Sequence, residues 1–181
     1  MIGNIDKIKQ KNRRLGMLLG TLFLVITAGV ALPAPDAPRK EAQESGIVGK
    51  HVRQIEFIPY DRRAPYADPA AKPYALLEFF TPHCGFCRRS VPELNRLAES
   101  DEVAVVAYTS GSGREVKTFV KTEGVAYPVS HTSREYSDLF NPVAVPVSFL
   151  VDTATLEIKA RFVGKVDADT VLRTAQQLTK G

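Results

Sequence analysis

The sequence predicts an α/β fold in which a central mixed sheet is flanked by helices and preceded by one N-terminal hydrophobic helix. Strand-type apolar runs alternate with amphipathic helical segments through most of the chain. A Cys-x-x-Cys pair lies where one such strand passes into a helix, and an uncharged run precedes all of these elements. The length of 181 residues suits one domain with a hydrophobic core of its own.

The N-terminal segment divides into a basic head, residues 1–14, and an apolar run, residues 15–32. The run holds about 18 residues without a charge, close to the minimum for a transmembrane helix. Basic residues before such a helix stay in the cytoplasm, so we expect a single-pass anchor in the inner membrane with the rest of the chain in the periplasm. Gly29 and Ala31 also fit a signal-peptidase site, and cleavage after Ala31 is the alternative. The length of the run favours the uncleaved anchor.

Residues 33–46, "PAPDAPRKEAQESG", are polar and Pro-rich and show no periodicity, so we interpret them as a tether between the membrane and a domain at 47–181. The formal net charge of +4 comes entirely from residues 1–14, and acidic and basic residues balance from Leu15 onward. No basic stripe is left to follow a phosphate backbone, which excludes nucleic-acid binding.

The first half of the expected domain contains the cysteine pair. Residues 52–58 alternate enough for a strand, and residues 59–75 form a loop interrupted by prolines. Residues 76–80 are a short apolar strand, and residues 88–100 carry apolar side chains at helical spacing. The pair therefore lies at a junction between a strand and a helix.

The second half continues the alternation of strands and helices. Residues 103–110, "VAVVAYTS", predict a buried strand, and residues 113–124 predict a helix that ends at Gly124. The elements that follow are a short extended segment (126–130), a helical segment (133–141), two strands (145–152 and 157–164) and a final amphipathic helix (167–180).

Cys84 and Cys87 are the two cysteines of the chain, and their position indicates redox chemistry. Cys84 is near the helix N-terminus, where the helix dipole and the unsatisfied amide groups favour a nucleophilic thiolate. Cys87 lies a turn inward, better shielded and placed to resolve a mixed disulfide on Cys84. A purely structural bridge is the alternative, although so short a loop restricts the unfolded chain very little.

The order of elements, the Cys-x-x-Cys at its junction and the proline that opens the penultimate strand resemble the thioredoxin superfamily, over residues 46–181. The segment "AYPVS" ahead of "VAVPVSFLVD" is similar to the membrane-tethered periplasmic TlpA, ResA and cytochrome c maturation group. The stretch "LEFFTPHCGFC" is closer to the DsbA oxidases, and its Gly-Phe pair is similar to the Gly-Tyr of disulfide isomerases. The resemblance implies a thioredoxin-like fold.

The same resemblance implies roles for individual residues. Cys84 would attack and Cys87 would resolve. Pro146 matches the proline that the superfamily holds in a cis peptide bond, which exposes neighbouring backbone to an extended substrate, and Val145 would face the disulfide. Glu78 stands where thioredoxin-like proteins place a buried acid. A buried carboxyl has a raised pKa and would accept the proton of Cys87 through water, whereas a carboxyl at the strand edge would only reach solvent.

Two residues beside the cysteines are further candidates. His83 replaces the tryptophan that thioredoxins and most tethered relatives place before the first cysteine. A charged imidazole there would stabilise the thiolate and raise the reduction potential, and a solvent-facing histidine is the alternative. Phe86 lies between the cysteines, where we expect it to be exposed and to contact substrate.

Rival classes are a Cu(I) carrier, in which both thiolates and a histidine bind the metal, and an envelope-assembly subunit with a vestigial site. A metal site has no need of Pro146, and retention of both cysteines disfavours a vestigial site. Zinc is weaker still because only two thiolates are available. We therefore predict no metal site.

The favoured interpretation is a periplasmic protein-disulfide reductase that acts on thiols or disulfides of envelope proteins and exchanges electrons with a membrane donor or acceptor. No organic cofactor is implied because the electrons reside in the cysteine pair. The tethered architecture favours reduction, whereas His83 and the DsbA-like stretch favour the alternative, an oxidase or isomerase of the DsbA/DsbC type.

Overall fold

A computed structural model describes residues 46–64 and 66–181. Five strands and four α-helices follow a short 3-10 helix in these residues. In chain order they are η2 (Pro69–Ala71), β1 (Tyr74–Phe79), α2 (Gly85–Ala98), β2 (Val103–Thr109), α3 (Gly113–Glu123), β3 (Val129–His131), α4 (Arg134–Phe140), β4 (Val147–Asp152), β5 (Ile158–Val163) and α5 (Ala168–Lys180).

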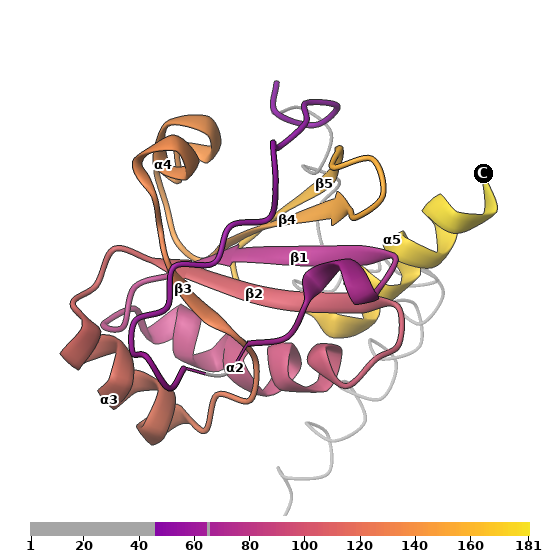
Figure 1. The fold of residues 1–181 in the computed structure, drawn as a ribbon. Helices are drawn as coiled ribbons and strands as arrows, with labels where there is room; N and C mark the ends of the chain where they lie inside the picture. The colour runs from indigo at the N-terminus through magenta and orange to yellow at the C-terminus, as the bar shows by residue number, and fades with distance from the viewer. Residues whose placement is uncertain (1–45, 65) are drawn as a thin grey trace, which may run out of the picture. The chain divides into compact units, whose positions relative to one another are not determined.

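The five strands form one mixed sheet in the order β3-β2-β1-β4-β5 (Figure 1). The strands β1, β2 and β3 run parallel, β4 runs antiparallel to β1, and β5 runs antiparallel to β4. The central strand β1 is buried along its whole length, as is β2 beside it. The mixed sheet that the sequence predicts is therefore present, with β1 in its centre and the cysteines directly after β1.

The two faces of the sheet are covered by different helices (Figure 1). Apolar side chains of α2, α3 and α5, such as Leu94, Phe119 and Val171, pack on one face. The other face packs against Tyr136 and Phe140 of α4. Alternate residues of β1 serve the two layers, and Leu76 and Phe80 point into the layer that contains α2 and Cys87.

Local sequence explains where the helices begin and end. Ser112 and Glu115 form a capping box at the start of α3, and Gly124 ends this helix with φ 67°, a conformation that glycine adopts without strain. Asp167 caps α5. The cysteine helix, expected over 88–100, begins earlier, at Gly85, because the sulfur of Cys84 serves as its N-cap.

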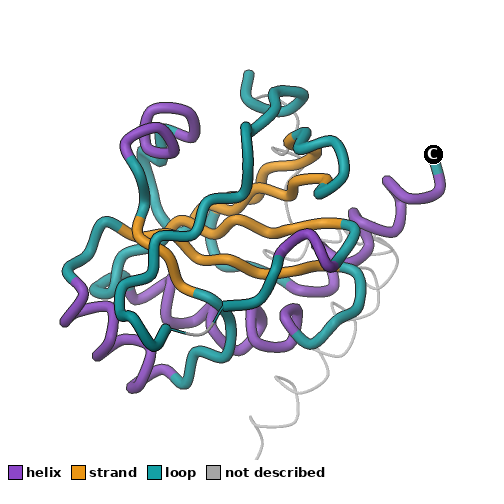
Figure 2. The backbone as a smooth tube through the Cα atoms, in the orientation of Figure 1, coloured by secondary structure: helices purple, strands orange, loops and turns teal. Residues whose placement is uncertain are grey.

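The strand expected at residues 52–58 is absent from the sheet, and this prediction is wrong. Figure 2 draws the segment as loop, and neighbouring residues make only the isolated bridges His51–Glu157 and Pro59–Ser130. In the middle of the segment, backbone carbonyls bind side chains instead: the Tyr108 hydroxyl donates to the Glu56 carbonyl, and the Tyr136 hydroxyl donates to the Gln54 carbonyl. Apolar side chains of the segment pack against the layer that contains α4, and this packing produces the alternation although the segment forms no strand.

The basic head, the apolar run at 15–32 and nearly all of the tether lie outside the described residues. Within 46–64 and 66–181, no helix has both the length and the apolar character that crossing a bilayer requires. The anchor therefore stays a prediction of the sequence.

Candidate active site

Cys84 occupies the first position of the cysteine helix, directly after a tight turn. The Cys84 N–H donates to the Thr81 carbonyl at 3.1 Å, which closes this turn at the end of β1. The Cys87 N–H then donates to the Cys84 sulfur at 3.3 Å. The sulfur of Cys84 thus accepts an N–H of the first helical turn, an arrangement that favours negative charge on it.

The two cysteines differ in their access to solvent. Both are free thiols, Cys84 partly exposed and Cys87 only 1% exposed. Burial, followed by the hydrogen bond with Cys84, raises the pKa of the Cys87 thiol to about 12. A partner molecule can therefore reach Cys84, whereas Cys87 needs a nearby base to lose its proton.

The loop before β4 lies against the reactive sulfur. The Val145–Pro146 peptide bond is cis, as the resemblance predicts. The Cys84 thiol donates to the Val145 carbonyl oxygen at 3.7 Å, and the Gly164 N–H donates to the Pro146 carbonyl at 2.9 Å. Elements far apart in the sequence therefore meet at Cys84, with the Val145 side chain packed between the two apolar layers.

Glu78 is buried in the centre of the sheet, with 1% of its surface exposed, so the alternative of a solvent-reaching carboxyl at a strand edge is wrong. The Ser148 hydroxyl, directly across the β1–β4 pair, donates to Glu78 Oε2, and Glu78 Oε1 has no partner within the described residues. Burial raises the pKa of Glu78 to about 8. Glu78 lies between Leu76 and Phe80 on one face of the sheet, and both of these pack in the core layer that contains Cys87 and Tyr127, so the carboxyl points into that layer.

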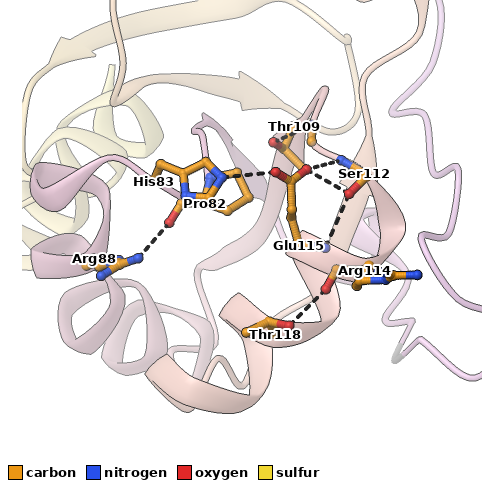
Figure 3. Close-up of polar contacts among 9 residues, drawn as sticks. Pro82, His83, Arg88, Thr109, Ser112, Arg114, Glu115 and Thr118 are labelled. Atoms are coloured by element: carbon orange, nitrogen blue, oxygen red, sulfur yellow. Dashed lines mark hydrogen bonds and ion pairs between the residues drawn. The ribbon is translucent and has the colours of Figure 1, made fainter.

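His83 points away from the cysteine helix, toward α3 (Figure 3). Its Nε2 lies 3.0 Å from Oε1 of Glu115, and the imidazole is largely exposed. This contact and the hydrogen bonds from Ser112 lower the pKa of Glu115 to about 2. Because Glu115 carries a negative charge beside the imidazole, it offsets the positive charge by which His83 was expected to stabilise the Cys84 thiolate.

A hollow of about 280 Å³ opens between α2 and α3. His83, Arg88 and Glu115 line it, and Cys84 does not. Arg88 donates to the Pro82 carbonyl at 3.2 Å (Figure 3) and lies 3.6 Å from a Glu123 oxygen. Through Arg88, these contacts hold the turn before Cys84 against α2 and link it to α3.

Phe86 lies at the surface beside Cys84, as expected, with 60% of its area exposed. The guanidinium of Arg89 lies 4.2 Å from the centre of its ring. Stacking of this kind holds an exposed aromatic side chain in place and leaves its other face free for contact.

Sequence reasoning missed Ser148 and Tyr127. The signal for Ser148 was the polar interruption in "VPVSFLVD", which matches the interruption that Glu78 makes in β1. The register that pairs them is visible only in the folded sheet. Among the described residues, no three His, Cys, Asp or Glu side chains gather as a metal site would require.

Comparisons by sequence and by structure differ in outcome. No family model matches the chain, and no curated protein matches it in sequence. The thioredoxin domain of a Bacteroides vulgatus thiol-disulfide oxidoreductase is similar with a TM-score of 0.59 and 15% identity, over 74% of this chain and 99% of that one. A thioredoxin-related protein from Neisseria meningitidis serogroup B is similar with a TM-score of 0.57 and 14% identity, over 70% of this chain and 100% of that one. StoA from Bacillus subtilis is similar with a TM-score of 0.50 and 22% identity, over 57% of this chain and 83% of that one. The described part of this chain therefore has the thioredoxin fold.

Proposed function

We propose that this protein is a protein-disulfide reductase, held on the periplasmic face of the inner membrane and acting on disulfides of envelope proteins. One observation carries the proposal: an accessible Cys84 lies against the cis Val145–Pro146 bond, and Cys87 is buried behind it. The rival Cu(I) carrier would add a histidine to the two thiolates, and among the described residues no His, Cys, Asp or Glu gathers with both sulfurs.

The reaction divides into two exchanges of sulfur bonds. The Cys84 thiolate attacks a substrate disulfide, forms a mixed disulfide and releases one substrate sulfur as a thiolate, which takes up a proton. Cys87 then gives its proton to Glu78 and attacks the Cys84 sulfur, which breaks the mixed disulfide and releases the second substrate sulfur. Two electrons pass to the substrate, and the cysteine pair ends as a disulfide.

The surface around Cys84 suits an extended polypeptide. Val145 supplies backbone on one side of the sulfur, and the exposed ring of Phe86 supplies an apolar contact. A membrane electron donor would return the pair to the dithiol form, and the anchor at residues 15–32 with the tether at residues 33–46 would keep the domain near that donor.

Reduction is favoured over oxidation by the surroundings of His83. An oxidase needs a Cys84 thiolate so stabilised that the reduced form is preferred. The ion pair with Glu115, at 3.0 Å, offsets the charge that His83 would offer to such a thiolate. Of the two observations that favour the alternative, an oxidase or isomerase of the DsbA/DsbC type, the charge of His83 is therefore weakened. The DsbA-like sequence of the cysteine stretch still favours it.

The reduction potential of the Cys84–Cys87 couple tests both the activity and its direction. We expect equilibration with glutathione to give a value near or below that of thioredoxin, about −270 mV. A value near that of DsbA, about −120 mV, would reverse the direction. A pair that does not exchange with glutathione at all would remove the oxidoreductase function itself, and the Cys84→Ser variant gives the baseline.

A further inference from the structure

Ser148 is the polar neighbour that the sheet gives to Glu78. In the sheet, Glu78 pairs with Ser148 of β4 on one side and with Ala107 of β2 on the other. The alanine side chain can make no hydrogen bond, so the serine hydroxyl is the donor that the two ladders offer. Ser148 is fully buried, and its hydroxyl donates to Glu78 Oε2.

This hydrogen bond determines which carboxylate oxygen is free. Oε2 is occupied by Ser148, and Oε1 has no partner among the described residues although it is buried. Glu78 shares a face of the sheet with Leu76 and Phe80, so its carboxyl points into the layer of α2, where the buried ionisable groups include Cys87 from α2 and Tyr127 from the segment before β3. Cys87 is the one that must lose a proton during turnover. A fixed Oε2 therefore leaves Oε1 available to the Cys87 proton, directly or through one water.

We propose that Ser148 is a positioning residue that holds the Glu78 carboxylate ready to take the proton of Cys87. The proposal rests on the reductase function, because it concerns the step in which Cys87 attacks the mixed disulfide. Ser148 lies two residues after Pro146 on β4, so one strand positions both the backbone beside Cys84 and the base behind Cys87.

The charge of the base explains why the hydroxyl matters. A buried carboxylate is costly, and a hydroxyl that donates to it stabilises the charged form. Ser148 lowers the pKa of Glu78 against the larger effect of burial. Removal of the hydroxyl leaves both carboxylate oxygens without a donor, so Glu78 becomes a base only at higher pH.

The experiment follows the Cys87 step alone. The reduced full-length protein is mixed with an aromatic disulfide, 5,5′-dithiobis(2-nitrobenzoate), in a stopped-flow instrument. Attack by Cys84 releases one coloured thiolate, and attack by Cys87 on the resulting mixed disulfide releases the second. The rate of the second release is measured from pH 5 to pH 10 for the wild type and for the Ser148→Ala, Ser148→Thr, Glu78→Gln and Glu78→Gln/Ser148→Ala variants.

We expect Ser148→Ala to shift the inflection of this pH profile upward by about one to two units and to slow the step at pH 7 about tenfold or more. Ser148→Thr keeps the hydroxyl and restores the profile. Glu78→Gln removes the inflection, and in that background Ser148→Ala changes the rate less than about twofold. If the alanine variant does not fold, the isosteric Ser148→Thr and Ser148→Val pair makes the same comparison.

Two results would overturn the proposal while leaving the reductase function intact. One is an unshifted profile in Ser148→Ala when Glu78→Gln still removes the inflection. The other is an equal slowing by Ser148→Ala with and without Glu78, which would assign Ser148 to folding only. Absence of any second release in the wild type would reject the reductase function together with the proposal.

Discussion

Cys84 and Cys87 are separated by two residues, yet their environments are opposite. Cys84 is the N-cap of α2 and lies against the Val145 carbonyl, whereas Cys87 is 1% exposed. In the proposed reaction, the partly exposed Cys84 sulfur meets the protein substrate and the buried Cys87 sulfur releases it. The difference in burial therefore supports the proposed order, in which Cys84 attacks first and Cys87 resolves the mixed disulfide.

Replacement of Cys87 should trap substrates. In Cys87→Ser the mixed disulfide on Cys84 has no resolving thiol, so we expect partner proteins to accumulate as species that a reducing agent releases. Non-reducing gel electrophoresis of the membrane fraction measures this. Cys84→Ser is the matched control and should trap few or no partners. Equal trapping by the two variants would contradict the assignment of the nucleophile.

Glu78 should make the stability of the domain depend on pH. Its pKa is raised from 4.5 to about 8 in the folded protein, so the folded state holds a proton that the unfolded state releases. Stability is therefore full below pH 4.5 and falls as the pH rises toward 8, by as much as roughly 5 kcal/mol. Urea unfolding of the reduced protein at pH 5 and pH 8 measures the free energy of unfolding.

Glu78→Gln supplies the control for this dependence. The amide does not titrate, so the variant should lose the fall between pH 5 and pH 8 and should be the more stable protein at pH 8. A wild type as stable at pH 8 as at pH 5 would mean that Glu78 is not a buried acid with a raised pKa.

The sequence was enough to single out the site residues but not their contacts. Cys84, Cys87 and Pro146 stand out through spacing and resemblance, and Glu78 through a charge within an apolar strand. The partner of His83 could not be predicted, because Glu115 lies far along the chain and belongs to the capping box of α3. The Ser148 partner depends on strand register, which no local pattern specifies.

At the scale of elements, α2 is joined to the chain after α3 through one side chain. Asn95 donates from Nδ2 to the Gly124 carbonyl at 2.9 Å, and its Oδ1 accepts from the Ala126 N–H at 2.8 Å. The segment so held leads directly into Tyr127, which is buried in the same core layer as Cys87. One amide thus fixes the loop that closes the buried side of the site.

Removal of this amide should destabilise the domain. We expect Asn95→Ala to lower the free energy of unfolding by about 1 to 2 kcal/mol, because two backbone groups lose their partner. Asn95→Asp keeps the acceptor for Ala126 but places a carboxylate oxygen against the Gly124 carbonyl where the donor was, so it should destabilise the domain at least as much as the alanine change. Urea denaturation of the three proteins measures the difference. A loss below about 0.5 kcal/mol in the alanine variant would show that water replaces the amide.

Most element boundaries follow from local chemistry, and the exception is instructive. Gly124 marks the end of α3 in the sequence as in the structure, and the structure adds a capping box of Ser112 and Glu115 at its start. Residues 52–58 alternate enough to predict a strand, yet the segment is a loop, because the hydroxyls of Tyr108 and Tyr136 bind the carbonyls of Glu56 and Gln54. Periodicity reports which side chains are buried and does not report what binds the backbone.

At the scale of the whole molecule, the proposed topology can be tested by fusion. Alkaline phosphatase joined after Gly181 should be active in cells, because the basic residues 1–14 stay in the cytoplasm and the apolar residues 15–32 carry the rest across. The same fusion without residues 15–32 is the control and should be inactive. Active enzyme from the control, or a full-length fusion found in the cytoplasm with both cysteines reduced, would reject the periplasmic location.

The fold as a whole was predictable because strands and helices alternate in a clear order, and because a mixed sheet with helices on both faces buries every apolar stripe. The sequence does not reveal which helix covers which face. That division follows from the strand order β3-β2-β1-β4-β5, which sends α4 to the face opposite α2.

Because Cys84 is the N-cap of α2, the oxidation state of its sulfur should also affect the thermal stability of the domain. A sulfur in a disulfide and a sulfur in a thiolate accept the Cys87 N–H with different strength. In a thermodynamic cycle, the difference in unfolding free energy between the oxidised and the reduced protein equals the change that folding makes to the reduction potential of the cysteine pair. A difference of about 1.4 kcal/mol corresponds to each 30 mV. Calorimetric melting curves of the oxidised and of the reduced protein thus measure how far folding shifts the reduction potential of the pair, and so how strongly it favours electron transfer to a substrate.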